Sequence, residues 1–150
     1  MNITLEAIKT AYKDFGAMIS AFEAKAPRTL VLPSESIELQ ADEHYAGVIV
    51  GENGIPTHHL VLMAGQVSDI TWDDAMAWAT KAGGELPTRA EQSLLFANLK
   101  GQFEPNWHWS CEQHAAGPST AWFQNFSYGG QDNYHLSYEG RARAVRRVAI

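Results

Sequence analysis

Residues suited to covalent chemistry are scarce in this sequence. Its 150 residues include a single cysteine, Cys111, which is followed by the acidic Glu112. A reactive thiolate needs a cation or a helix N-terminus nearby to lower its pKa, and an acidic neighbour has the opposite effect. One cysteine also excludes an intrachain disulfide. We therefore expect no catalytic residue and no dependence of folding on an oxidising compartment.

The histidines are poorly arranged for holding a metal ion. His58 and His59 are adjacent, so on a strand their side chains would point to opposite faces and would not hold one ion together. His108, His114 and His135 could meet in space, but their spacing matches no zinc motif. The sequence predicts neither a metal site nor a bound cofactor.

The C-terminal third, from about Trp107 to Val148, has a composition suited to binding. Small hydrogen-bonding side chains mixed with tyrosine are typical of adaptable recognition surfaces, because tyrosine supplies contact area at a low entropic cost. An ordinary polar face with turn-forming residues would have a similar composition. The predicted ligand-binding residues are His108, Ser110, His114, Asn125, Ser127, Tyr128, Asp132, Asn133, His135, Ser137 and Tyr138, with Ser119 in a loop beside them.

Strand alternation gives these residues their expected direction. Successive side chains of a strand point to opposite faces of its sheet. If the bulky Trp109 and Trp122 face the core, then Ser110, Phe123 and Asn125 point outward. We therefore expect a single open surface formed by the last strands and their loops.

The charge of the chain argues against a nucleic-acid partner. The formal net charge is −6, so the surface as a whole repels a phosphate backbone. Four arginines cluster near the end, and the alternation of arginine with alanine there indicates a solvated strand edge paired with nearby acids. These residues are Arg141, Arg143, Arg146 and Arg147.

Nothing in the sequence resembles a signal for export or a membrane span. The stretch Met1–Glu6 lacks the basic start and the apolar run of a secretory signal, and no segment approaches the roughly 20 apolar residues that cross a bilayer. We expect synthesis in the cytoplasm without a signal peptide, and no membrane insertion.

An amphipathic helix is predicted over residues 2–25, ending before Pro27. Its apolar residues alternate spacings of three and four, which is the pattern of a coiled-coil seam and predicts a homo-oligomer, a trimer being favoured. A helix that docks on its own domain needs the same stripe, and Gly16 weakens a regular coiled coil. The seam consists of Leu5, Ile8, Tyr12, Phe15, Ile19 and Phe22.

The rest of the chain is predicted to form strands, then two helices, then a meander of strands. Residues 45–50 and 57–63 flank Asn53-Gly54 and predict a β-hairpin, after weaker strand signals at 30–32 and 37–39. Two helices are predicted, one from the capping box Thr71–Asp74 to about residue 82 and one from the capping box Thr88–Glu91. A meander follows, with strands at 107–110, 121–126, 134–138 and 141–148 and loops at 115–119 and 129–133.

Several motifs in this order resemble a known group of proteins. The motifs are Thr71-Trp72-Asp73-Asp74-Ala75, Gly83-Gly84-Glu85-Leu86-Pro87-Thr88, Trp109-Ser110, Ala121-Trp122-Phe123 and Arg141-Ala142-Arg143-Ala144-Val145-Arg146. They resemble bacterial and phage domains of unknown function with the C-type-lectin fold. They are also similar, more distantly, to the variable proteins of diversity-generating retroelements and to the formylglycine-generating enzyme family.

The resemblance implies an α+β, C-type-lectin-like fold, with two helices packed on a small twisted antiparallel sheet. The match covers roughly residues 45–150 and implies that the ligand contacts lie on the last strands. The N-terminal helix lies outside the match, so the expected domains are a helix at 1–27, a candidate oligomerisation element, and a binding domain at 28–150. The expected function is non-enzymatic recognition of a protein or glycan by a phage or prophage protein, such as a receptor-binding, tail-associated or retroelement-type variable protein in a virion. The alternative is an intracellular phage factor that binds a host protein.

Two other functions suggested by the resemblance fit the residues less well. The oxidative chemistry of formylglycine-generating enzymes uses a pair of reactive cysteines, whereas Cys111 is alone. Glu104-Pro105-Asn106 matches the sugar-selecting tripeptide of calcium-dependent lectins, and its oxygens are suitable calcium ligands. The partner motif Trp-Asn-Asp of those lectins is missing, and Gln131-Asp132-Asn133 is only a partial substitute.

Overall fold

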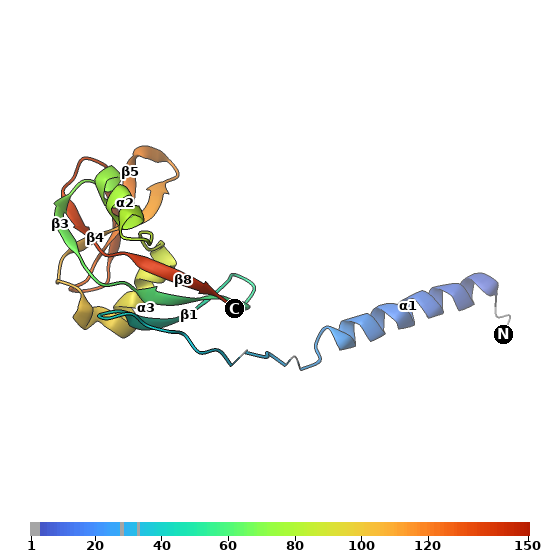
Figure 1. Ribbon diagram of the computed structural model, residues 1–150. Coiled ribbons are helices and arrows are strands. Elements are labelled where there is room, and N and C mark those ends of the chain that lie inside the picture. The colour runs from blue at the N-terminus through green and yellow to red at the C-terminus, as the bar shows by residue number, and fades with distance from the viewer. Residues whose placement is uncertain (1–3, 28, 33) are drawn as a thin grey trace. The chain divides into compact units, whose positions relative to one another are not determined.

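The computed structural model describes residues 4–27, 29–32 and 34–150, and the chain divides into two units, Met1–Ser34 and Glu35–Ile150. The first unit contains helix α1, Leu5–Glu23 (Figure 1). Thr4 caps it, because its hydroxyl oxygen accepts a hydrogen bond from Ala7 N at 3.2 Å. The predicted N-terminal helix is confirmed, although its expected start at residue 2 lies outside the described residues.

None of the described side chains of α1 is buried. The six seam residues and Met18 are all exposed. The weaker strand signals were wrong, because the described residues of 30–32 and 37–39 form no regular structure. Over the described part of the chain, no helix is long and apolar enough to cross a membrane.

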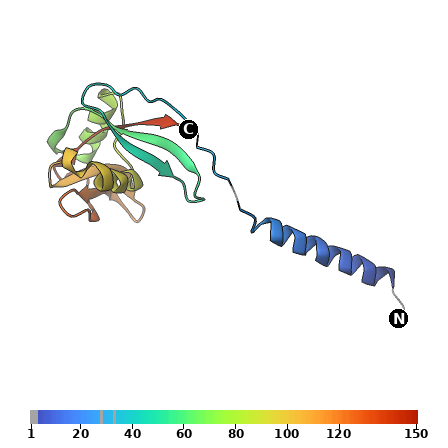
Figure 2. The ribbon, with the colours of Figure 1, turned by 90° about the horizontal axis from the view of Figure 1, so that it is seen from below.

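The second unit is an α+β fold. Strands from the two ends of its sequence form a three-stranded sheet. Strand β1, His44–Val50, pairs with β2, Pro56–Leu62, which pairs with the last strand β8, Val145–Ala149. Figure 2 shows β1 and β2 as a hairpin. The predicted hairpin is therefore confirmed, and Gly54 takes a φ of +76°, which suits glycine in its turn.

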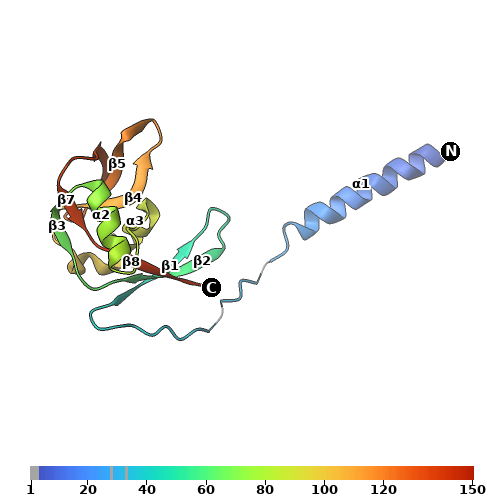
Figure 3. The same cartoon turned by 45° about the horizontal axis from the view of Figure 1, so that its top comes forward.

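A five-stranded sheet carries the C-terminal meander. Its order is β3-β7-β4-β5-β6, and Figure 3 shows β4 and β5 in this sheet apart from β1 and β2. All its pairs are antiparallel except β4 with β7. The strands are β3 Val67–Ile70, β4 Trp107–His114, β5 Gly117–Asn125, β6 Gln131–His135 and β7 Gly140–Ala142.

The sequence placed several of these strands incorrectly. The segment predicted as one strand at 141–148 is two strands, β7 and β8, which belong to different sheets. Most of the loops predicted at 115–119 and 129–133 is strand, and β6 ends at His135 rather than continuing to residue 138. Strand β3 was not predicted. The boundaries of a strand depend on the neighbouring strands with which it pairs, and the local composition of a segment does not reveal those neighbours.

The two predicted helices are present, and both lie along the chain between strands β3 and β4 of the five-stranded sheet. Helix α2, Trp72–Lys81, follows β3, and helix α3, Arg89–Leu99, continues into a short 3₁₀ helix, Lys100–Gln102. The capping box of Thr88 and Glu91 is confirmed, with both reciprocal hydrogen bonds present. The capping box predicted at Thr71 is wrong. The Thr71 hydroxyl donates to the Asp74 carboxylate at 2.9 Å and accepts no hydrogen bond from the helix backbone.

Two apolar clusters form the core of the second unit. One lies between α2 and the five-stranded sheet and includes Ala75, Leu86, Trp109 and Phe123. The other includes Leu60 and Leu62 of β2, Leu95 of α3, Phe103 and Phe126. The five-stranded sheet is therefore covered by α2 on one face and contacted by α3 on the other.

Candidate ligand-binding surface

Three of the predicted binding residues are buried. His108 is only 2% exposed, and Ser110 and Asn125 are buried as well. Ser110 does point away from Trp109, but that face is covered by α3, whose Gln92 amide donates to the carbonyl of His108 at 2.9 Å. The prediction that these three side chains lie on an open surface was therefore wrong.

The alternation expected for β5 is also reversed. Phe123 is 3% exposed and stacks on Trp109 with ring centroids 5.3 Å apart, so Phe123 faces the core. Trp122 lies on the other face, which we call the α3 face, where the guanidinium of Arg89 sits 3.6 Å from the centroid of the Trp122 ring. Both tryptophan and phenylalanine suit a core position, so residue type did not decide the phase of the strand.

The predicted residues of β6, Asp132, Asn133 and His135, divide between the two faces of that strand. Asp132 and its neighbour Tyr134 pair with Phe123 and Ala121 of β5, so they share the face of the apolar core. Asn133 and His135 point to the α3 face, where His114 lies near Trp122 with ring centroids 5.1 Å apart. His135 Nδ1 and the Ser137 hydroxyl are 2.7 Å apart. The single surface expected from the sequence is thus two surfaces.

One of these surfaces is a row of aromatic rings around Phe123. We call Trp107, Tyr128, Tyr134 and Tyr138 the aromatic surface. Trp107 stacks on Phe123 at 4.2 Å and contacts Tyr128 edge-on at 6.0 Å. On the other side of Phe123, Tyr134 and Tyr138 meet edge-on at 4.7 Å. These geometries are favourable for aromatic pairs and hold the rings rigidly.

The aromatic surface is open to a ligand at two of its members. Tyr128 is 65% exposed and Tyr134 is 51% exposed, whereas Trp107 and Tyr138 are half-buried. Asp132 is exposed on the same face of β6. Among the described residues, the hydroxyls of Tyr128 and Tyr134 take part in no hydrogen bond, so they are available to a ligand.

Gly130 allows the position of Tyr128, because a Cβ there would lie 2.3 Å from the Tyr128 ring. The neighbouring Gly129 has a φ of +85°, and a Cβ there would lie 2.7 Å from the Phe96 ring. Both positions of this turn therefore require glycine, and the ring of Tyr128 packs over Gly130.

The sequence missed two members of the aromatic surface, Trp107 and Tyr134. Tyr134 follows Asp132 by two residues, so the alternation of β6 would have placed it beside that predicted residue. Trp107 was expected to begin a strand, and its half-exposed position depends on Phe123 being beneath it. The sequence therefore contained a usable signal for Tyr134 but none for Trp107.

The arginine cluster is largely an internal set of ion pairs. Arg146 donates to the Glu43 carboxylate at 2.7 Å and 2.8 Å, and this pairing holds the pKa of Glu43 below its usual range. Arg147 pairs with Glu91 and Glu85. The predicted pairing with acids is confirmed for these arginines and for Arg141, which lies 2.6 Å from Glu104.

Arg143 departs from the predicted solvated edge. It is buried, and its guanidinium donates to the backbone carbonyls of Gln102 and Met63. Burial lowers its pKa from the ordinary value. Arg143 thus ties the segment between β7 and β8 to the loops around it, which is a structural role.

The chemical groups that suggested rival functions are occupied or unreactive. Burial raises the pKa of the Cys111 thiol to about 11, and the carboxylates of Glu112 and Glu91 add to this effect. The thiol therefore stays protonated at neutral pH and is a poor nucleophile. The Glu104 carboxylate of the calcium-lectin-like tripeptide is engaged by Arg141. In the described part of the chain, no three His, Cys, Asp or Glu side chains are grouped to hold a metal.

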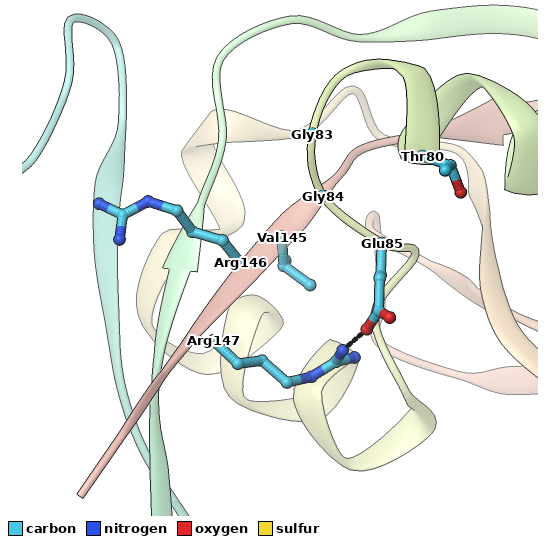
Figure 4. A pocket seen from close by; sticks show the side chains of 7 residues that line it. All are labelled: Thr80, Gly83, Gly84, Glu85, Val145, Arg146 and Arg147. Carbon is cyan, nitrogen blue, oxygen red and sulfur yellow. Dashed lines mark ion pairs between the residues drawn. The ribbon is translucent and has the colours of Figure 1, made fainter.

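A wide cavity of about 560 Å³ lies between the end of α2 and strand β8 (Figure 4). Its lining includes Glu85, Arg146 and Arg147, and Figure 4 shows the Glu85 carboxylate directed at the Arg147 guanidinium. Because both arginines are neutralised by acids of the same unit, this cavity offers no free cation to a ligand.

No protein-family model matches the sequence, and no curated protein matches it significantly.

Proposed function

We propose that this chain is a non-enzymatic recognition protein that binds a protein or glycan through the aromatic surface. The observation that carries the proposal is the exposure of Tyr128 and Tyr134 on a row of stacked rings. Rigid, partly exposed aromatic side chains lose little entropy on binding, and they dominate the energetics of protein and antibody interfaces. Sugar rings also present an apolar face that can stack on such a surface.

We further propose that the second unit is C-type-lectin-like and that the protein is encoded by a phage or prophage. Two helices packed on a mainly antiparallel sheet support the scaffold. The residues of the aromatic surface lie on β4, on β6 and in the turns that follow β5 and β6, which agrees with binding on the last strands and their loops. Such a protein would act as a receptor-binding, tail-associated or retroelement-type variable protein. Fold alone does not give function, so the aromatic surface carries the argument.

The absence of catalysis is part of the proposal. Cys111 is the residue most suited to covalent chemistry, and the raised pKa of its thiol argues against a nucleophilic role. Glu104 is held by Arg141, which argues against calcium-dependent sugar binding at that tripeptide. Binding that is lost when calcium is chelated would favour the calcium-dependent function instead.

The test is a paired substitution at the two exposed tyrosines. The full chain is immobilised and exposed separately to glycans and to proteins from bacterial envelopes. We expect one fraction to bind, and Tyr128→Ala with Tyr134→Ala to weaken that binding at least about 30-fold, since each such aromatic can contribute 2 kcal/mol or more.

The matched control is Tyr45→Ala, an exposed tyrosine in the other sheet. It should leave binding unchanged. Stability of the double variant should fall by no more than about 1 kcal/mol, because the lost rings are largely exposed. Undiminished binding by the double variant would refute the role of the aromatic surface.

A further inference from the structure

A second, smaller cavity lies beside strand β4, away from the exposed tyrosines. It measures about 170 Å³ and is lined by Gln66, Val67 and Ser68 around the start of β3, by Glu104, by His108 and by Arg141. We call it the His108 cavity. It is below the roughly 300 Å³ at which pockets for drug-sized ligands begin, so an occupant would be no larger than about one ring.

His108 supplies the cavity with a hydrogen-bond acceptor. Its Nδ1 lies 3.0 Å from the carbonyl oxygen of Asn106, and because a carbonyl only accepts, Nδ1 must carry the proton and donate. Burial lowers the pKa of His108 to about 4, against the opposing effect of the Asn106 carbonyl, so the ring is neutral at pH 7. Its Nε2 therefore has a free lone pair.

His108 lines the cavity, and its Nε2 has no hydrogen-bond partner in the described part of the chain. The side-chain atoms there that are fully buried without a partner are Gln92 Oε1 and Arg143 Nε, so Nε2 keeps some accessible surface although the ring is 2% exposed. The edges of Phe103 and Phe126 pack against the ring and fix its orientation.

The opposite side of the cavity is polar but nearly neutral overall. Arg141 donates from Nε to Glu104 Oε2 at 2.6 Å, which leaves its two terminal nitrogens without partners in the described part of the chain. The carboxylate of Glu104 accepts, the guanidinium of Arg141 donates, and the Ser68 hydroxyl does both. Because the ion pair cancels its own charge, the cavity favours no ionic ligand.

We infer that the His108 cavity binds a neutral polyol, a single sugar ring or a smaller polyhydroxyl compound. Each hydroxyl of such a ligand both donates and accepts, which matches an imidazole acceptor, a carboxylate acceptor and a guanidinium donor in one small space. A hydroxyl that donates to His108 Nε2 would give a hydrogen bond to an acceptor that has no partner among the described residues. This site is independent of the aromatic surface.

The test is a titration observed at the imidazole of His108. The ¹⁵N-labelled full chain is titrated in EDTA with D-mannose, D-galactose and myo-inositol, each alone, and with the methyl glycosides of the two sugars. We expect at least one probe to shift the His108 Nε2 resonance in a saturable way at millimolar concentration. Binding of free sugars alone indicates a free polyol, and binding of methyl glycosides indicates the terminal residue of a glycan.

Two variants locate the site without disturbing the core. Ser68→Ala alters an exposed side chain and should weaken binding about fivefold, and Arg141→Gln should weaken it about tenfold or more. The matched control Tyr134→Ala, which damages the aromatic surface, should bind the polyol as the wild type does. No shift at His108 with any probe, or unchanged binding in both cavity variants, would overturn the inference.

Discussion

Buried His108 makes the stability of the second unit depend on pH. Burial lowers its pKa to about 4 from an ordinary value of 6.5, the Asn106 carbonyl and Glu104 raise it, and the cations Arg141 and Arg143 lower it further. Between these values the unfolded chain binds a proton that the folded chain does not. The contribution of neutral His108 to the free energy of unfolding is therefore fully present above about pH 6.5. It is lost as the pH falls toward 4, and the loss is on the order of 3 kcal/mol.

The measurement is urea unfolding at pH 7 and at pH 4.5 for the wild type and for His108→Asn. An asparagine amide can keep the donor to the Asn106 carbonyl but does not titrate. We expect the variant to be less stable at both values and to lose less stability between them. Equal losses in the two proteins would mean that other groups account for the pH dependence.

Glu91 joins three elements at one buried carboxylate. It caps α3 by accepting from Thr88 N at 2.8 Å, and it binds His58 of β2 at 2.8 Å and Arg147 of β8 at 2.5 Å and 2.9 Å. A Glu91→Gln substitution keeps the shape but removes the charge that these donors share. We expect a loss of about 2 to 3 kcal/mol in the free energy of unfolding, measured by chemical denaturation.

The control for this element is Glu6→Gln on α1. Glu6 is exposed and its carboxylate pairs with Lys9 on the surface of the helix, so its substitution should change stability by less than about 0.5 kcal/mol. If Glu91→Gln changes the free energy of unfolding as little as Glu6→Gln does, then Glu85 and solvent are sufficient partners for Arg147 when the Glu91 charge is removed.

The apolar stripe of α1 suggests that several copies of the chain act together. Within its own unit this 19-residue helix leaves a stripe of large apolar side chains uncovered, and an isolated helix of this length is only marginally stable in water. We propose that α1 pairs with α1 of other copies, as a trimer, and so multiplies a weak single-site affinity. Docking of the stripe on its own second unit is the alternative.

Mass measurement in solution decides between these arrangements. We expect the wild type to be oligomeric at micromolar concentration and Ile8→Lys with Ile19→Lys to be monomeric with the second unit still folded. Lys13→Ala, off the stripe, should leave the mass unchanged. A monomeric wild type would remove self-association through α1.

The sequence by itself determined the elements whose signals are local. The helix at 5–23, the hairpin turning at Asn53-Gly54 and the box of Thr88 and Glu91 each depend on residues a few positions apart. Turn geometry and capping act within one or two turns of the chain, so a single sequence contains them. The C-type-lectin-like family and its function remain proposals.

Which C-terminal side chains are open to a ligand depends on packing between segments far apart in the sequence. Ser110 and Phe123 point to opposite faces of the five-stranded sheet, and both are buried because α3 and α2 contact those two faces. Alternation along a strand says which residues share a face, but it does not say which face is covered. The packing of the helices therefore separated the aromatic surface from residues that look equally suited to binding.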